Sequence, residues 1–418
     1  MIKYQSFMKV SDEDTELKIW NYTGDLKDDG NKYRGCITDK SNEVICPSLG
    51  YTYEYYIDTK EESMDRFKRL SDWQWFYSTE GTMLRLFYYK EQWRITTHKK
   101  LSAFDSRWSC NQSFGELFVQ CLEKLYPNRT EDVYKWFLNQ LDKDRIYYFM
   151  LRSNSQNRVI CHTSSIEEKD HLIFIGYRNV QEMNFILGTN ENTPELRGVQ
   201  KSLKIGENFE TVDDLFQFVE NQIDPFQYQG IIGFSLVDGN YEITKIINSR
   251  YKELAKIRGN NHNLKFRYLE IRNDPQKVEK LFMLYPKQVS TFDEYEKVLI
   301  KIVKRISKTY VDRFINCKYI TLPKEEYIVL RKCNEWCRHH KETFISQNQI
   351  MAIINMESPL NVYKMIQRYR NDEMQQRFYQ NRIKKTNTFD NIVSFYNFER
   401  KISNHSLDQI TDSSDSTQ

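Results

Sequence analysis

The chain has 418 residues, of which 39% are hydrophobic and 28% are charged, and its formal net charge is only +3. It is long enough for two or three domains with cores of their own, and its charge balance excludes a uniformly basic nucleic-acid-binding protein, so any basic surface must be local. No apolar run reaches the length of about 18 residues that a membrane span needs, and the first residues lack the apolar core of a signal peptide. We therefore expect no membrane span and no secretion.

Eight cysteines are scattered along the chain without a Cys-x-x-Cys pair. In a chain of this length the pattern is typical of reduced intracellular thiols, so we expect a cytoplasmic protein. Cys333 and Cys337 are one turn apart on a predicted helix, with His339 and His340 close behind. A zinc site needs four converging ligands, usually from two elements, so no metal site is expected there.

Paired β-rich runs are the main feature of the N-terminal two-thirds of the chain. Each pair flanks a short polar segment, which predicts two adjacent strands joined by a turn. In the last pair, Asp238-Gly239 is a strong turn signal. The pairs are 83–89 with 93–98, 145–152 with 158–161, and 230–237 with 241–247.

Two helices are expected between these strands. The first is opened by a capping box, in which a hydroxyl residue is followed three positions later by an acidic residue. Ser113 and Glu116 form this box, ahead of an apolar run through Leu125. The segment Thr211-Val212-Asp213-Asp214 is expected to open the second helix, which runs through Gln222.

The chain becomes helical after about residue 274. Thr291 is expected to cap a helix whose apolar residues recur every three or four positions, and Pro323 opens the next helix. Ser346 and Ser358, the latter followed by proline, cap two more. A tail rich in Ser, Asp and Thr should be disordered. We expect an α+β domain, an all-helical domain and a disordered tail, with the ranges 1–274, 275–401 and 402–418.

Five short motifs follow one another within the α+β region. They read Tyr-Arg-Gly at 33–35, Ser-Thr-Glu-Gly at 78–81, Thr-His-Lys-Lys at 97–100, Gln-Gly-Ile-Ile at 229–232 and Lys-Ile-Ile at 245–247. Over residues 30–255, this order and spacing resemble the phage-type RNA ligases of the covalent nucleotidyltransferase superfamily. In that family an RG strand precedes a KxDG motif, and a Glu-bearing strand, an EG motif and a KxK motif follow.

The whole chain resembles a divergent form of that family found in large cytoplasmic DNA viruses. There, EGT, THKK and RGN segments occur with a helical C-terminal region, and the matching segments here begin at Glu80, Thr97 and Arg258. The resemblance implies a nucleotidyltransferase domain of antiparallel sheets, ATP-grasp-like, with a cleft between them. It also implies ATP and Mg²⁺ as cofactors, RNA as a partner and, for a viral protein, the host cytoplasm as location.

The chemistry of that family needs a lysine amine that attacks the α-phosphate of ATP and forms lysyl-AMP. A carboxylate holds the metal ion, lysines offset phosphate charge and an acidic residue holds the ribose. In this sequence Ser78 stands at the nucleophile position, where no phosphoramidate can form. Leu151, Gln229 and Ile247 replace the ribose-binding Glu, the metal-associated Glu and the second lysine of the last motif.

Other positions of the implied site keep their polarity. The candidate nucleotide-binding residues are Arg34, Glu80, Gly81, Arg85 and Lys245. Arg85 alternates with apolar neighbours, so it is either a phosphate ligand or a solvated strand residue. Lys99 and Lys100 lie on the return side of the first hairpin and are the candidate substitute nucleophiles.

A basic stretch interleaved with aromatic residues follows the last motif and contains Arg258, Arg267 and Arg272. Such a stretch suits nucleic acid, although it is also typical of a solvated face. One functional hypothesis is a catalytically degenerate relative that binds nucleotide and RNA ends. The alternatives are an active ATP-dependent RNA ligase with a relocated lysine, and a structural or interaction protein with a protein partner on its helical domain. The oligomeric state stays open.

Overall fold

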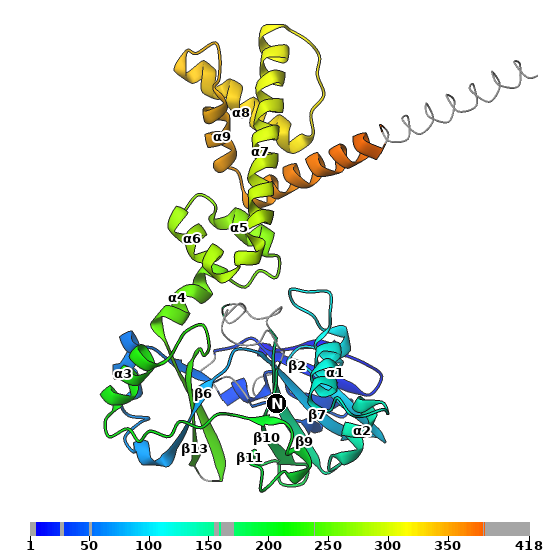
Figure 1. Ribbon diagram of the computed structural model, residues 1–418, viewed down its shortest axis with the longest axis vertical. Helices are drawn as coiled ribbons and strands as arrows, with labels where there is room; N and C mark the ends of the chain where they lie inside the picture. Colours follow the sequence, from blue (N-terminus) through cyan, green and yellow to red (C-terminus); the bar gives the residue numbers. More distant parts are fainter. Residues whose placement is uncertain are drawn as a thin grey trace, which may run out of the picture. The chain divides into compact units, whose positions relative to one another are not determined.

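The computed structural model of the chain describes residues 6–25, 29–49, 52–153, 159, 171–237, 239–378 and 380. Contacts divide the chain into two compact units, Met1–Val289 and Ser290–Gln418 (Figure 1). The sequence changes character earlier, near residue 274. The domain ranges expected from the sequence therefore remain a prediction.

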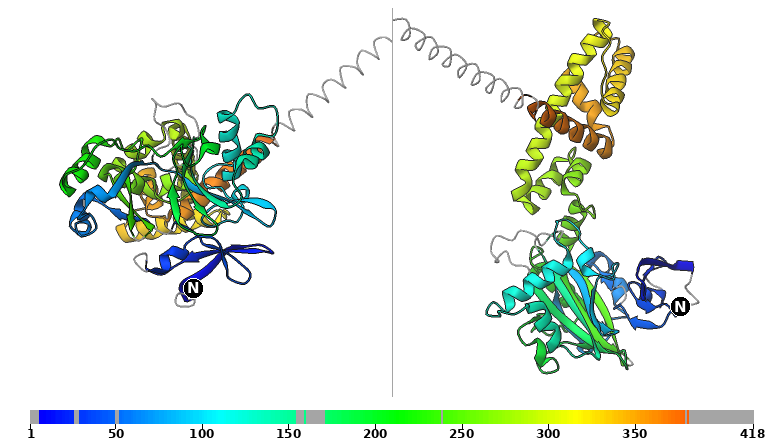
Figure 2. Two further views of the ribbon diagram at one scale, coloured as in Figure 1. Left: turned by 90° about the horizontal axis from the view of Figure 1, so that it is seen from below. Right: turned by 90° about the vertical axis from the view of Figure 1, so that its right-hand side faces the viewer.

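A small antiparallel sheet is formed by the first strands of the described chain. Its order is β1-β2-β3-β4, with β1 at Met8–Glu13, β2 at Leu17–Tyr22, β3 at Ile37–Asp39 and β4 at Val44–Cys46. Figure 2 shows this sheet, in dark blue, beside the larger sheets of the same unit. Arg94, from a later hairpin, forms ion pairs with Asp14 and Glu16 of the turn between β1 and β2. Buried Leu17 and Ile19 of β2 belong to one apolar cluster with Phe87 of a later strand, so packing also attaches the small sheet to the rest of the unit.

A larger sheet has the strand order β11-β10-β9-β7-β8 among the described residues, and β12 pairs in parallel with β10. The other pairings are antiparallel. Its strands are β7 Thr82–Tyr89, β8 Gln92–Thr96, β9 Arg145–Arg152, β10 His171–Asn179, β11 Phe185–Leu187 and β12 Gln200–Lys201. The turn between β7 and β8 consists of Lys90 and Glu91, both with positive φ, as a two-residue hairpin turn requires.

The remaining sheet has the order β5-β14-β13-β6, in which β14 pairs in parallel with β5. Its strands are β5 Tyr53–Tyr55, β6 Trp73–Ser78, β13 Gly230–Val237 and β14 Asn240–Ile247. Buried Phe76, Tyr148 and Phe234 belong to one apolar cluster that joins this sheet to the β7–β9 sheet. The two sheets therefore share a core and face each other within the first unit.

The described α-helices of the first unit are α1 Phe114–Leu125, α2 Val133–Gln140, α3 Val212–Gln222, α4 Ser249–Arg258, α5 Leu264–Ile271 and α6 Pro275–Leu284. Helices α1 to α3 cover outer faces of these sheets, whereas α4 to α6 pack mainly on one another. Phe118 and Phe137 of α1 and α2 pack with Phe149 of β9, and α3 packs its buried face on the other sheet. The 3-10 turns are η2 Asp29–Tyr33, η3 Ile57–Ser63, η4 Leu70–Asp72, η5 Ala103–Asp105, η6 Pro194–Leu196 and η7 Pro286–Gln288.

The second unit is helical throughout the part that the structure describes. Its helices are α7 Val289–Tyr310, which continues into the π-helical turn η8 Val311–Ile315, α8 Lys324–His340, α9 Gln347–Asn355 and a further helix over 359–378. Fully buried Glu326 of α8 forms an ion pair with Arg305 of α7. A buried carboxylate needs such a partner, because an isolated one would be costly to remove from water.

The structure confirms the expected α+β class, with mainly antiparallel sheets followed by helices, although β12 and β5 pair in parallel with their neighbours. The helices expected to begin at Ser113 and Thr211 are α1 and α3, and a capping box opens each of them. The cap expected at Thr291 is wrong, because η7 leads directly into a helix that begins at Val289. The strand expected at 158–161 and the tail 402–418 lie outside the described residues, apart from Val159. Within the described chain, no helix combines the length and apolarity that membrane spanning needs.

Candidate functional site

The polar site begins where the chain passes from one sheet to the other. Ser78 ends β6 and pairs with Gly230 of β13, whereas Thr82 begins β7 in the facing sheet. Gly81 lies in this crossover, and a Cβ there would come within 2.6 Å of the Leu151 carbonyl oxygen. This close approach explains the glycine, because any side chain would push the crossover away from β9.

Three of the motif positions meet at the side chain of Gln229. Its Oε1 accepts hydrogen bonds from Ser78 Oγ at 3.3 Å and from Lys245 Nζ at 3.4 Å. Its Nε2 donates to the hydroxyl of Tyr251 at 3.0 Å. Ser78 and Gln229 are also joined through their backbones, since the Gln229 amide donates to the Ser78 carbonyl at 2.8 Å. These contacts orient the amide and bring the nucleophile, metal and lysine positions of the motifs together.

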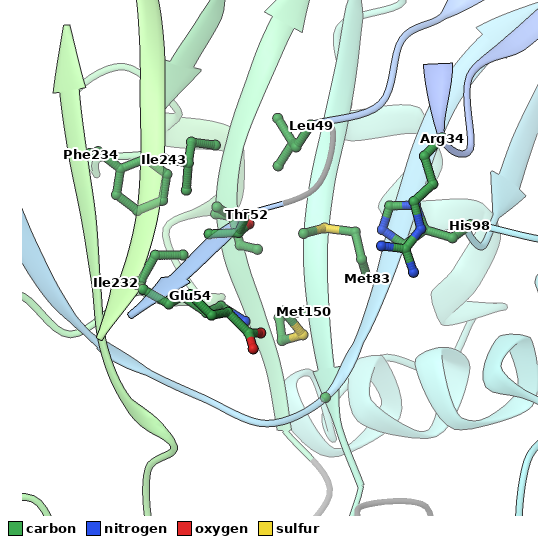
Figure 3. Close-up of a pocket in the computed structure, with 13 residues that line it drawn as sticks. Arg34, Leu49, Thr52, Glu54, Met83, His98, Met150, Ile232, Phe234 and Ile243 are labelled. Atoms are coloured by element: carbon green, nitrogen blue, oxygen red, sulfur yellow. The ribbon is translucent and has the colours of Figure 1, made fainter. Parts of the chain in front are cut away.

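A cavity of about 260 Å³, here called the inter-sheet cavity, lies beside these residues (Figure 3). Its polar lining comes from Arg34, Thr52, Glu54, His98 and Lys245. Its apolar lining consists of Leu49, Met83, Met150, Ile175, Ile232, Phe234 and Ile243. Flexible Met side chains and a flat Phe ring suit a planar apolar group, whereas the cations suit an anion.

A second cavity of about 590 Å³, the loop-side cavity, shares Gly81, Met83 and His98 with the first. Other parts of its lining are Glu80, Thr82, Thr97, Lys99, Ser106, Arg107, Trp108, Phe114, Gln229 and Asn260. It is more polar than the inter-sheet cavity and combines two exposed cations with an indole. Because the two cavities share a wall, a ligand in one can approach a ligand in the other.

A narrow pocket of about 50 Å³ extends the site beyond Lys245. Ser78, Thr79, Ser202 and Lys245 supply its polar lining. One water molecule occupies roughly 30 Å³ of liquid, so the pocket admits only a small group. The rest of its lining is largely apolar, and the Ser78 hydroxyl already donates to Gln229, so Thr79, Ser202 and the Lys245 ammonium are the groups that can donate to a small anion there.

Arg85 is buried beneath two backbone segments, whereas the sequence left open a phosphate ligand or a solvated strand residue. Its side chain is 0% exposed, and its guanidinium donates to the carbonyls of Gly35 and, at 2.6 Å, of Thr97. The sequence showed the alternation around Arg85 but not the backbone that passes over it. Arg85 therefore positions the Arg34-Gly35 segment and the Thr97-His98 segment, which border both cavities.

Arg34 and His98 lie against each other at one end of the inter-sheet cavity (Figure 3). Burial lowers the pKa of His98 to about 3, and the neighbouring charges of Arg85 and Arg34 lower it further. His98 is therefore neutral near pH 7. Gly35 makes room for the ring, because a Cβ there would come within 2.6 Å of His98 Nδ1 and its φ is +82°.

The two candidate substitute lysines differ in position. Lys100 donates to Asp12 of the small sheet at 3.2 Å, so its ammonium is directed to that carboxylate. Lys99 is exposed and lines the loop-side cavity. Lys245 is the lysine that contacts the Ser78–Gln229 pair.

Glu80 and Leu151 are both buried. Glu80 is 5% exposed, lines the loop-side cavity and accepts a hydrogen bond from the Val159 amide at 3.0 Å. Leu151 lies in the sheet opposite Thr82 and joins the apolar cluster under α1. A nucleotide ribose therefore gains no carboxylate from position 151.

Arg258, expected to bind nucleic acid, is instead a buried structural residue. It is 1% exposed, and its Nε donates to the Tyr285 hydroxyl at 2.8 Å. Its guanidinium carbon lies 4.8 Å from the ring centroid of Trp108. Arg258 therefore holds α4 against Trp108, which lines the loop-side cavity.

Arg267 is also tied to the backbone. Its Nε donates to the Ile257 carbonyl at 2.8 Å, and a terminal nitrogen donates to the Lys256 carbonyl at 2.9 Å. These are carbonyls of the last turn of α4, which a cation stabilises. Arg272 is half-buried at the end of α5. A phosphate-binding role of these arginines would compete with the contacts that they make.

The resemblance implies Mg²⁺ at position 229, but the residues there do not fit it. Gln229 is neutral, and its Oε1 already accepts hydrogen bonds from Ser78 and from the Lys245 ammonium. Mg²⁺ prefers carboxylate and water oxygens, and the ammonium would repel it. In the part of the chain that the structure describes, no three His, Cys, Asp or Glu side chains group to hold a metal. No step is assigned to a metal held at this position.

Sequence reasoning assigned no role to Glu54, Trp108 or Tyr251. Glu54 reaches the site through a parallel pairing in which it is in register with Lys245, far away in the sequence. No local pattern around Glu54 could have shown this. The bond between Tyr251 and Gln229 likewise depends on how α4 packs after β14.

No protein-family model matches the chain. Two proteins named immediate-early protein ICP-46 homolog, from Invertebrate iridescent viruses 6 and 3, are 27% and 26% identical to it over 325 and 354 residues. These matches cover 75% and 81% of this chain, and 69% and 74% of the relatives. Immediate-early protein ICP-46 of Frog virus 3 is 26% identical, over 51% of this chain and 54% of that protein.

Ligases are among the solved structures that match part of this chain. A mutant RNA ligase of Naegleria gruberi with ATP and Mn is 9% identical, with a TM-score of 0.36, and the match covers 50% of this chain and 58% of that chain. A protein from Aquifex aeolicus assigned as an ATP-dependent DNA ligase is 12% identical, with a TM-score of 0.40, over 73% of this chain and 78% of that chain. Both scores are low, so the function proposed below rests on this chain's own residues.

Proposed function

We propose that the first unit binds ATP in the inter-sheet cavity and an RNA end in the loop-side cavity, without forming lysyl-AMP. The carrying observation is the convergence of Ser78 and Lys245 on Gln229 Oε1, beside both cavities. These polar residues are far apart in the sequence, and core packing alone does not require them to meet.

The lining of the inter-sheet cavity supports a nucleotide. Phe234, Met83 and Met150 offer an apolar surface to a flat base, while Arg34 and Lys245 offer positive charge to phosphate. The cavity is slightly below the usual volume range of ligand pockets, about 300–1,000 Å³. The narrow pocket beyond Lys245 adds room for a small anionic group. A base in the apolar part and phosphates toward Lys245 use the apolar surface, the Lys245 ammonium and the narrow pocket.

Covalent chemistry is not supported by the group at the nucleophile position. The Ser78 hydroxyl is buried and donates to Gln229, and no phosphoramidate can form on an oxygen. Each transition-state partner that is lost typically costs on the order of 3 kcal/mol, or about a hundredfold in rate. Gln229 and Ile247 are two such losses. The site is thus better suited to holding a nucleotide than to reacting with it.

The loop-side cavity supports an RNA end. Exposed Lys99 and Arg107 can neutralise phosphates, and Trp108 can stack on a base. The cavity borders the nucleotide site through His98 and Gly81. A single-stranded end would therefore lie beside the bound nucleotide.

The active-ligase alternative has one specific observation in its favour. Lys99 lines the loop-side cavity and is exposed, so its amine is accessible to a bound nucleotide there. The relocated nucleophile would then be Lys99 and not Lys100, which pairs with Asp12. Label from α-labelled ATP that survives denaturation in the wild type and disappears in Lys99→Ala would support this alternative.

Equilibrium dialysis with ATP tests the proposal. We expect Lys245→Ala to weaken ATP binding about tenfold or more, because it removes a cation beside the phosphates. Lys124→Ala, in an exposed position on α1, is the matched control and should bind like the wild type. Equal binding by both variants would contradict the placement of ATP in this cavity.

A further inference from the structure

We infer that Glu54 accepts hydrogen bonds from the ribose hydroxyls of the nucleotide, so that the inter-sheet cavity discriminates against nucleotides lacking those hydroxyls. The inference deepens the proposed nucleotide binding and rests on it. It concerns a residue that none of the motifs contains.

Glu54 is placed by the topology of the smaller sheet. Strand β5 is the edge of the order β5-β14-β13-β6, and it pairs in parallel with β14. In that pairing Glu54 is in register with Lys245. Register partners on neighbouring strands project to the same face of a sheet, so both side chains face the cavity. Figure 3 shows the Glu54 carboxylate directed into the cavity, toward Met150.

Glu54 is the sole carboxylate among the described residues that line the inter-sheet cavity. The other polar side chains there include Arg34 and Lys245, which attract anions, and His98, which is neutral. A carboxylate accepts hydrogen bonds and cannot donate them when ionised. The ligand must therefore present donors to Glu54 and acceptors to the cations.

The orientation of the carboxylate is fixed by a neighbour. The Tyr56 hydroxyl donates to Glu54 Oε2 at 2.9 Å. The Lys245 ammonium is directed to Gln229 Oε1, at 3.4 Å, on the side of the site toward Ser78. Phosphates are repelled by Glu54 and attracted by Lys245, so a nucleotide keeps its phosphates at Lys245. The part that then faces Glu54 must carry neutral donors.

The cavity thus requires a flat apolar group, an anionic group and neutral hydrogen-bond donors, and a ribonucleotide has all three. Its base is flat and largely apolar, its phosphates are anionic, and its vicinal hydroxyls are donors located between the two. A hydrogen bond between a hydroxyl and a carboxylate is stronger than one between neutral groups. An analogue without these hydroxyls forfeits the hydrogen bonds to Glu54 and should therefore bind more weakly.

Competition binding tests the inference, with ATP and 2′,3′-dideoxy-ATP as the two probes. We expect the wild type to prefer ATP by about tenfold or more, the effect of one or two charge-assisted hydrogen bonds. Glu54→Gln should bring the two Kd values to within about twofold of each other, mainly by weakening ATP. Glu54 is exposed, so this variant should fold, and a thermal melt verifies that.

Glu242→Gln is the matched control. Glu242 is an exposed residue of β14 three positions from Lys245, and it therefore projects from the opposite face of the sheet. It should keep the wild-type ratio of the two Kd values. A wild type without preference, or a ratio unchanged in Glu54→Gln, overturns the inference while ATP binding stands. A wild type that binds neither probe overturns the proposed function and this inference together.

Discussion

Ser78 and Lys245 share one hydrogen-bond acceptor, since Gln229 Oε1 accepts from the Ser78 hydroxyl at 3.3 Å and from the Lys245 ammonium at 3.4 Å. Ser78 ends β6 and Lys245 lies in β14, and β13 runs between these two strands. The site thus contains the amine of Lys245 on β14, whereas the lysine of a KxDG motif would stand at position 78, at the end of β6. The neutral amide of Gln229 takes the place where a carboxylate would attract a metal ion.

The first prediction concerns the lost nucleophile. Ser78→Lys alone should not produce a covalent adduct with α-labelled ATP and Mg²⁺, because Gln229 remains neutral and the new ammonium lies close to Lys245. The double variant Ser78→Lys/Gln229→Glu should produce a detectable adduct, since a carboxylate attracts the metal ion and offsets the added charge. Label on denaturing gels is the measurement. Label in Ser78→Lys alone would show that Gln229 and Ile247 do not disable the site.

The second prediction concerns the crossover between the sheets. Gly81→Ala should destabilise the first unit by about 1–3 kcal/mol. The reason is that a Cβ added at position 81 would lie only 2.6 Å from the Leu151 carbonyl oxygen. Gly206→Ala is the control, since no atom lies within 4 Å of a Cβ placed there. Urea unfolding measures both changes. Equal stability of the two variants would show that the crossover relaxes without cost.

The third prediction concerns pH. The pKa of His98 is lowered to about 3 in the folded protein from an ordinary value of 6.5, mainly by burial. Between these two pH values, His98 is protonated in the unfolded chain and neutral in the folded chain. Its contribution to the free energy of unfolding is therefore fully present above pH 6.5 and is lost as the pH falls toward 3. The loss from this residue should approach about 1.4 kcal/mol per pH unit.

His98→Gln provides the comparison for that pH dependence. The wild type should lose stability faster than this variant as the pH falls from 6.5 to 4.5, and the difference between the two cancels the contributions of other residues. Urea midpoints at several pH values give the difference. A difference that does not change with pH would mean that His98 is protonated equally in both states.

The fourth prediction separates the basic residues that face the loop-side cavity from those that hold the backbone. Lys99→Glu and Arg107→Glu should weaken binding of a short single-stranded RNA and reduce its salt dependence, because each removes a phosphate contact. Arg267→Glu should instead lower the unfolding midpoint, because Arg267 donates to carbonyls at the end of α4. Filter binding at several salt concentrations and urea unfolding distinguish these effects. Weaker RNA binding in Arg267→Glu at unchanged stability would reverse the assignment.

Local signals in the sequence predicted the elements of the fold well. The capping boxes at Ser113 and Thr211 open helices where expected, and the Asp-Gly signal coincides with the hairpin of β13 and β14. Such signals act between neighbours in the chain, so they can be read without knowing the fold. The cap expected at Thr291 failed because a preceding 3-10 turn continued into the helix.

The candidate site was less predictable, because it depends on contacts between distant residues. The motif order assigned positions 78, 229 and 245 to one implied site, and in the structure Ser78 and Lys245 both contact Gln229. Arg85 donates to a backbone carbonyl of another segment, and Arg258 donates to a tyrosine hydroxyl of another segment. The local sequence around each arginine does not show these partners, so their burial could not be predicted from it. Glu54 joins the site only through a long-range parallel pairing with β14.

The most direct test of the account follows α-labelled ATP through native and denaturing conditions in one sample. In equilibrium dialysis the wild-type protein and Lys124→Ala should both retain the label. Lys245→Ala should retain much less of it. Denaturing electrophoresis of the same wild-type sample should show no labelled protein, because Ser78 cannot form the adduct. Label that survives denaturation would contradict noncovalent binding, and a wild type that retains no label before denaturation would contradict nucleotide binding itself.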